Sequence, residues 1–95
     1  MKTKLTKLQE WYQRHCDGEW EHSWGIKIDT LDNPGWTVEI NLQETIYENA
    51  TWAPLFVDNN EEDWITCRKE LGNFKGVGDP SKLEEILEYF LSNVE

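Results

Sequence analysis

The chain has 95 residues, with 19 acidic and 9 basic side chains, which gives a formal net charge of −10. This length supports one modest hydrophobic core, so we expect a single domain over residues 1–95. The negative charge disfavours nucleic acid and anionic membranes as partners, because both are bound through basic patches. It favours a basic protein or a cation, although acidity also serves solubility alone.

The beginning of the sequence bears on where the protein works. "MKTKLTKLQEWYQ" has no apolar run of the kind found in a signal peptide, and no later segment is long enough to span a membrane. Without an export signal, Cys16 and Cys67 are expected to be reduced thiols rather than a disulfide. We therefore expect a cytoplasmic protein.

The first expected element is an amphipathic helix over residues 3–15. Its apolar and aromatic side chains recur at helical spacing, at Leu5, Leu8, Trp11, Tyr12 and His15. Asp17 and Gly18 then end the helix, since glycine readily takes up the left-handed conformation that often follows a helix.

From Trp20 the apolar period changes to two, which predicts two strands over 20–28 and 36–42 joined as an antiparallel hairpin. The connecting "DNPG" predicts a type II turn, with Gly35 at positive φ. The apolar face of the two strands comprises Trp20, His22, Trp24, Ile26, Ile28, Trp36, Val38, Ile40 and Leu42. We therefore assign its tryptophans to the core rather than to a ligand platform.

The second half is predicted as a short strand and an irregular segment over 45–57, an acidic loop over 58–63, an edge strand over 64–71 and a glycine-rich connection. The final helix has Pro80 in its first turn and a capping-box pattern at Ser81 and Glu84. Its expected buried stripe is Leu83, Ile86, Leu87, Phe90, Leu91 and Val94. The order predicts an α+β fold, with a three- or four-stranded antiparallel sheet and both helices on one face.

No catalytic, cofactor or metal site is predicted. The possible metal ligands lack the spacing of a binding motif, and they are His15, Cys16, His22 and Cys67. "GNFKGVG" departs from both phosphate-binding glycine patterns, and Asp79 would repel a phosphate at the helix start.

Two alternatives remain open from the residues themselves. One is a small enzyme, with Cys67 as a sulfur-transfer nucleophile beside Arg68, or with Glu21 and His22 as an acid–base pair. The other is a carbohydrate- or peptide-binding module, which requires at least two coplanar exposed tryptophans.

Several motifs occur together in the chain. They are a tryptophan and a tyrosine late in the first helix, "CDGEWEHSWGIKIDTLDNPGW", then Asp63, Trp64 and Cys67, and finally "FKGVGDPSKLEEILEYFL". This combination resembles the immunity protein 53 family of bacterial polymorphic toxin systems, from about Trp11 to Leu91. The resemblance implies a small non-enzymatic cytoplasmic protein, encoded beside a toxin, that binds the toxin and protects the producing cell. It implies no catalytic residues and leaves the toxin unidentified.

The acidic loop is the predicted partner-binding site. Asp58, Glu61, Glu62 and Asp63 place four carboxylates within six residues, and Trp52 and Trp64 border them as candidate aromatic anchors. The other interpretation is that these acids only aid solubility. The second-choice surface is the outer side of the predicted hairpin, at Glu19 and Glu21. The expected partner of the protein is a basic, nuclease-like toxin domain. The protein would inhibit it by electrostatic steering and occlusion.

Overall fold

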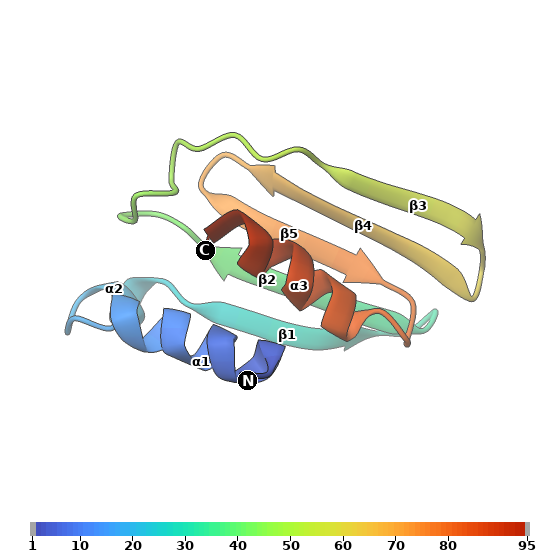
Figure 1. The fold of residues 1–95 in the computed structure, drawn as a ribbon, viewed down its shortest axis with the longest axis horizontal. Helices are drawn as coiled ribbons and strands as arrows, with labels where there is room; N and C mark the ends of the chain where they lie inside the picture. The colour runs from blue at the N-terminus through green and yellow to red at the C-terminus, as the bar shows by residue number, and fades with distance from the viewer. Residues whose placement is uncertain (1, 95) are drawn as a thin grey trace.

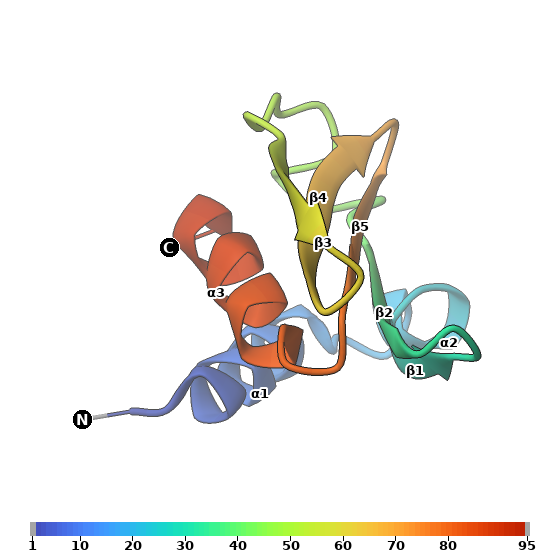
Figure 2. The ribbon, with the colours of Figure 1, turned by 90° about the vertical axis from the view of Figure 1, so that its right-hand side faces the viewer.

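The computed structural model describes residues 2–94 and contains a five-stranded antiparallel sheet (Figure 1). The strands lie in the order β1-β2-β5-β4-β3. Helices α1 and α3 lie on one side of the sheet (Figure 2). The element bounds are α1 Lys4–His15, α2 Trp20–Ser23, β1 Ile26–Leu31, β2 Gly35–Asn41, β3 Leu55–Asn60, β4 Asp63–Glu70, β5 Asn73–Gly78 and α3 Leu83–Val94. The predicted α+β class is confirmed, but the sheet has five strands rather than three or four.

Helix α1 forms over the predicted residues, but Leu5 and Tyr12 of its predicted apolar stripe are exposed. The Thr3 hydroxyl oxygen accepts a hydrogen bond from the Thr6 N–H at 3.1 Å, which caps the first turn. Leu8 and Trp11 are buried on the inner face of the helix. Gly18 has a φ of 92°, so the predicted left-handed glycine after the helix is confirmed.

The predicted strand from Trp20 is wrong in its first half, because residues 20–23 form the short helix α2. The Asp17 carboxylate accepts hydrogen bonds from the N–H groups of Glu19 and Trp20, both at 2.9 Å. The Glu21 carboxylate accepts hydrogen bonds from the N–H groups of Asp17 and Gly18. These local bonds satisfy the backbone in a turn, and they override the alternating apolar pattern. Strand β1 begins only at Ile26.

The glycine-rich stretch predicted as a connection is β5, the central strand of the sheet. Its glycines leave room for α3. A Cβ atom on Gly76 would overlap Ile86 Cγ2, and one on Gly78 would lie 2.7 Å from Lys82 Cβ. Close helix packing therefore explains the low side-chain volume of a strand that carries little strand propensity.

Three other predictions are corrected. Gly35 has no positive φ, so the type II turn is wrong; a Cβ there would lie 2.5 Å from the Gly78 carbonyl oxygen. Residues 43–49 form turns, and the strand follows them as β3 instead of preceding an irregular segment. Strand β4 pairs with both β3 and β5, so it is an interior strand and not an edge.

The start of α3 also differs from the prediction. The helix begins at Leu83, and the Ser81 N–H and hydroxyl both donate to Asp79 Oδ1, at 2.8 and 2.6 Å. Ser81 therefore does not act as the first half of a capping box. The predicted stripe is confirmed, since Ile86, Leu87, Phe90, Leu91 and Val94 are buried and Leu83 is half-buried.

Aromatic rings fill the space between the helices and the sheet. Trp11 is completely buried and lies edge-on to Phe90, with 5.0 Å between ring centroids, and to Trp20 at 5.8 Å. Trp24 and Trp36 are half-buried against this core, and their indole N–H groups donate to Glu44 Oε2 and to the Pro80 carbonyl. The assignment of Trp20, Trp24 and Trp36 to the core is thus confirmed, with Trp20 the most deeply buried.

We expect Gly76→Ala to lower the free energy of unfolding by about 1–3 kcal/mol, because the added methyl group overpacks the contact with Ile86. Combining it with Ile86→Leu, which removes the branch that the new methyl meets, should restore part of the loss. Gly25→Ala is the matched control, since no atom lies within 4 Å of its added Cβ. Urea unfolding of the wild type, of both single variants, of the double variant and of the control measures the effect, and additive losses in the double variant would contradict it.

Candidate partner-binding surface

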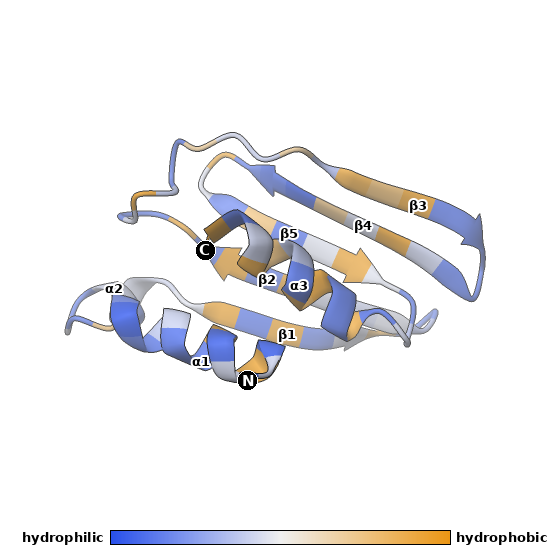
Figure 3. Ribbon diagram, viewed as in Figure 1, coloured by the Kyte–Doolittle hydropathy of each residue, from blue (hydrophilic) through white to orange (hydrophobic). Residues whose placement is uncertain are grey.

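The acidic segment 58–63 is the tip of the β3–β4 hairpin rather than an irregular loop. Strand β3 continues to Asn60, β4 begins at Asp63, and a bulge lies between Asp58 and Asn60. The Asn60 side-chain oxygen accepts a hydrogen bond from the Glu62 N–H at 2.8 Å, which stabilises the turn. Figure 3 shows this end of the hairpin as strongly hydrophilic.

Three of the four predicted carboxylates are solvent-exposed at this tip, and we call Asp58, Glu61 and Glu62 the acidic end. Asp63 is different, because its Oδ1 lies 2.7 Å from Lys82 Nζ and its Oδ2 accepts a hydrogen bond from Asn59. These hydrogen bonds, with that from Lys82 the largest influence, lower the pKa of Asp63. Asp63 therefore holds the hairpin in place. Its carboxylate is less available to a partner than the carboxylates of the acidic end.

The two predicted tryptophan anchors lie on opposite faces of the sheet. Trp52 is buried against Phe74 and Phe90, so it belongs to the core. Trp64 is half-buried and lies directly across from Asp58 on β3. Since its neighbour Ile65 points to the helices, Trp64 projects to the opposite side of the sheet, as strand alternation requires. Only Trp64 accompanies the acidic end.

Glu19 directly precedes α2 and Glu21 lies within it, and α2 is at the other end of the molecule from the β3–β4 hairpin tip (Figure 1). The longest dimension of the fold is 42 Å, so the eight predicted site residues do not form one surface. The Glu21 carboxylate is also engaged in the turn, and hydrogen bonds from its own N–H and from those of Gly18 and Asp17 lower its pKa. We therefore assign Glu21 a structural role.

A buried ion pair lies directly below the hairpin, and sequence reasoning missed it. Asp79 and Lys82 are both buried, with 2.8 Å between Asp79 Oδ2 and Lys82 Nζ. Burial alone would raise the pKa of Asp79, but hydrogen bonds from Lys82, Ser81 and the Trp64 N–H lower it well below its usual range. Hydrogen bonds to Asp63 and Asp79 raise the pKa of Lys82. A signal was present in the D-P-S-K sequence, where a carboxylate and an amine are three residues apart at a helix start.

The enzymatic alternatives gain no support from the geometry. Cys67 is completely buried, and burial followed by the charge of Glu85 raises its pKa to about 12. It is therefore a thiol at neutral pH and not a nucleophilic thiolate. Glu21 is occupied by backbone N–H groups, which lower its pKa, whereas a general acid needs a raised value. Within residues 2–94 there is no cluster of three His, Cys, Asp or Glu side chains suited to a metal ion.

The tryptophan-lined module is also unsupported. All six tryptophans lie in the described part of the chain, and each is buried or half-buried. The three partly accessible indoles are those of Trp24, Trp36 and Trp64, and the N–H groups of the first two are already donated within the protein. No pair of exposed coplanar rings is present in residues 2–94 to stack on a sugar or an extended peptide.

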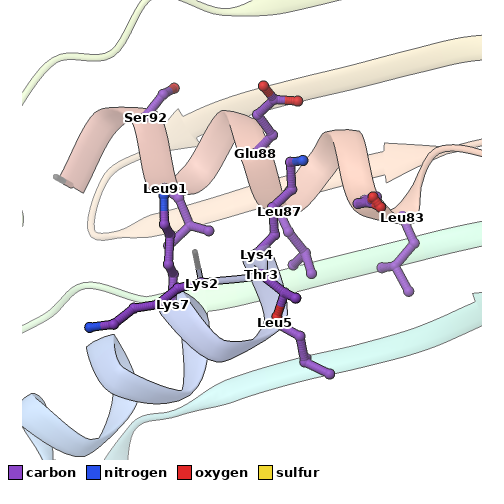
Figure 4. Close-up of a pocket in the computed structure, with 11 residues that line it drawn as sticks. Lys2, Thr3, Lys4, Leu5, Lys7, Leu83, Leu87, Glu88, Leu91 and Ser92 are labelled. Atoms are coloured by element: carbon purple, nitrogen blue, oxygen red, sulfur yellow. The ribbon is translucent and has the colours of Figure 1, made fainter.

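The helical layer carries a groove of about 910 Å³ between the start of α1 and α3 (Figure 4). Three lysines border it on the α1 side, and leucines of α3 form its other wall. The residues on its two sides include Lys2, Lys4, Lys7, Leu83, Leu87 and Leu91. Glu84 and Glu88 of α3 also line the groove, so a basic partner would meet charges of both signs here. No helix within residues 2–94 is both long and apolar enough to cross a membrane.

The burial of Cys67 predicts a large difference between the two thiols. At pH 8, Cys16 should react with iodoacetamide in the native protein, because it is exposed, whereas Cys67 should react only after unfolding in guanidinium chloride. Mass spectrometry of the alkylated protein measures this difference. The control is Cys16→Ser, in which Cys67 is the single remaining thiol. Rapid native labelling of Cys67 would revive the sulfur-transfer alternative.

The Asp79 network predicts a dependence of stability on pH. The lowered pKa values of Asp79 and Asp63 stabilise the fold above the unfolded-state value of about 4, and this contribution is lost as the pH falls through the folded-state values. The raised pKa of Lys82 contributes fully below 10.5, and this is lost as the pH rises through its folded-state value.

We therefore expect Asp79→Asn to lower the Tm at pH 7 by on the order of 10 °C, because Lys82 loses its buried partner. Between pH 7 and pH 3 the Tm of this variant should fall less than that of the wild type. Thermal melts by circular dichroism measure both, and Asp32→Asn in the exposed β1–β2 turn is the control. Equal losses of Tm on acidification would show that Asp79 is not responsible.

Comparison with known proteins bears on the identity of the chain. A family model described as immunity protein 53 matches residues 5–95. No curated protein and no solved structure matches the chain. The match includes all the strands and nearly all of both long helices, from the apolar face of α1 to the end of α3. The chain therefore belongs to the immunity protein 53 family.

Proposed function

We propose that this protein neutralises a cognate bacterial toxin by binding a basic, nuclease-like domain of the toxin and covering the surface on which that domain acts. Membership of the immunity protein 53 family is the observation that carries this proposal. The family supports a toxin partner, and the charge distribution of the chain supports the basic character of that partner. The protein acts in this proposal as a stoichiometric inhibitor in the cytoplasm and has no catalytic step.

The acidic end is the part of the surface best suited to attract such a toxin. None of the ion pairs in residues 2–94 includes Asp58, Glu61 or Glu62, so their charges are not neutralised by a neighbouring amine. The nearest buried amine, Lys82, is already shared by Asp63 and Asp79. The β1–β2 turn lies at the same end of the molecule (Figure 1) and adds the exposed Asp32.

Two physical effects follow from this concentration of charge. A negative end attracts a positively charged cleft over roughly a Debye length of 8–10 Å, which raises the rate of encounter. In the bound complex the carboxylates take the place of the phosphates that a nuclease cleft accommodates, so substrate and inhibitor compete for one surface. Charge thus raises the association rate and the selectivity, while slow dissociation of the complex needs an apolar contact as well.

Co-expression tests the function itself. Cells that produce the toxin encoded beside this gene should grow when they also produce this protein, and they should stop growing without it. An immunity protein of an unrelated family, produced to the same level, is the control for non-specific protection. Growth arrest despite full production of the folded protein would count against the proposal for that toxin.

Reversal of charge tests the role of the acidic end. The double variant Glu61→Lys, Glu62→Lys should associate with the toxin about tenfold more slowly or worse at low salt, with a smaller deficit at high salt. Glu85→Lys, Glu88→Lys makes the same change in net charge on exposed positions of α3, and it should slow association much less. Stopped-flow association rates measure the difference. Equal slowing in both double variants would mean that net charge alone matters.

A further inference from the structure

We infer that the toxin packs on the face of the sheet that carries no helix, with Phe56 as the aromatic anchor of the contact. This inference rests on the proposed function and adds the surface and the kind of partner surface that fits it. The face, called the helix-free face below, presents Phe56, Trp64, Thr66, Val77 and Thr37. It lies on the side of the sheet opposite α1 and α3 (Figure 2).

Strand pairing identifies the residues on this face. Ile65 and Cys67 are buried under the helices, so Thr66 between them must point the other way. Phe56 pairs directly with Thr66 on β4, and Thr66 pairs with Val77 on β5. Val77 in turn pairs with Thr37 on β2. These side chains form one row across four strands, with the aromatic ring of Phe56 at one end of the row.

The exposure of Phe56 is costly for the isolated protein. Phe56 is 71% exposed, although the transfer of its ring from water to an apolar contact is favourable. The half-buried Trp64 lies two residues along the adjacent strand, on the same face. A large aromatic ring at the centre of a dry contact, beside a second one, is the usual composition of an energetic hot spot.

Charge specifies the occupant of this face. Asp58 follows Phe56 on the same side of β3, and the acidic end continues from it toward the hairpin tip. On the other side of the row, Arg68 lies opposite Lys75. Glu70 forms an ion pair with Arg68, and Glu39 lies opposite Lys75, so the charges on that side largely compensate one another. A basic toxin surface with an apolar pocket beside it therefore fits the half of the face nearest the acidic end. The groove on the helical layer is lined by lysines as well as by Glu84 and Glu88, so it lacks the uncompensated negative charge of the acidic end.

Two other exposed apolar residues provide matched controls. Ile46 is 87% exposed and Leu71 is 93% exposed, so both exceed Phe56 in exposure. They lie in turns at the end of the molecule away from the acidic end (Figure 1). If exposed apolar area alone governed binding, these two residues would matter at least as much as Phe56.

The experiment measures binding to the toxin domain encoded beside this gene, made inactive by mutation, with surface-immobilised toxin. Phe56→Ser should increase the dissociation rate about 30-fold or more, as expected for a hot-spot residue. Thr66→Arg, which places a long cation at the centre of the row, should weaken binding at least as strongly. Ile46→Ser and Leu71→Ser should each change the dissociation rate less than about threefold. Circular dichroism melts verify that all four variants are folded.

The outcomes separate this inference from the function on which it rests. If the wild type binds the toxin but Phe56→Ser and Thr66→Arg dissociate as slowly as the wild type, the helix-free face is not the contact, and the immunity function stands. If Ile46→Ser or Leu71→Ser weakens binding instead, the contact is at the opposite end. If the wild type neither binds the toxin nor protects cells from it, the proposed function itself fails.

Discussion

The buried carboxylate of Asp79 joins strand β4 to the segment that leads into α3. It accepts hydrogen bonds from the Trp64 N–H on β4, from Ser81 in the connection to α3, and from the Lys82 ammonium. Lys82 also forms an ion pair with Asp63 at the base of the β3–β4 hairpin. A buried charge is tolerated only when it is fully hydrogen-bonded, and Asp79 meets that condition. The position of the acidic hairpin relative to the helices therefore depends on one residue beneath it.

The central strand imposes the second constraint. Gly76 and Gly78 allow α3 to lie directly on β5, and this close packing brings Phe90 into contact with Trp11 and Phe74. Because both long helices occupy that side of the sheet, the other side is left uncovered. An uncovered antiparallel sheet normally carries polar side chains. Here the exposed Phe56 and the half-buried Trp64 depart from that pattern, and they do so beside the exposed carboxylates.

The two layers of the molecule therefore have different roles. The helical layer and the inner side of the sheet hold the deeply buried tryptophans, the buried thiol of Cys67 and most of the apolar surface, and they account for stability. The helix-free face and the acidic end contribute little to the core. Side chains there can consequently be changed with little loss of stability.

Much of the fold followed from local patterns in the sequence. The 3.6-residue periods of α1 and α3, the alternation in β2, the buried positions of the tryptophans around the first hairpin and the antiparallel α+β class were all predictable, because each arises from contacts within one element or between neighbours. The family resemblance was also readable from the motifs, and the family match confirms it. The location of four acids between residues 58 and 63 was equally plain.

The tertiary structure decided what each of those residues does. Whether "NFKGVG" is a loop or a central strand depends on its pairing with β2 and β4, and its glycines leave the space that Ile86 and Lys82 occupy. Whether Asp63 is a free charge depends on Lys82, and whether Trp52 or Trp64 reaches solvent depends on which side of the sheet the helices cover. Residues 20–23 are an exception, because local hydrogen bonds from nearby N–H groups to the carboxylates of Asp17 and Glu21 decide their conformation. Composition and periodicity record the apolarity of each position, but pairing, burial and the choice of face arise from long-range packing that no local pattern contains.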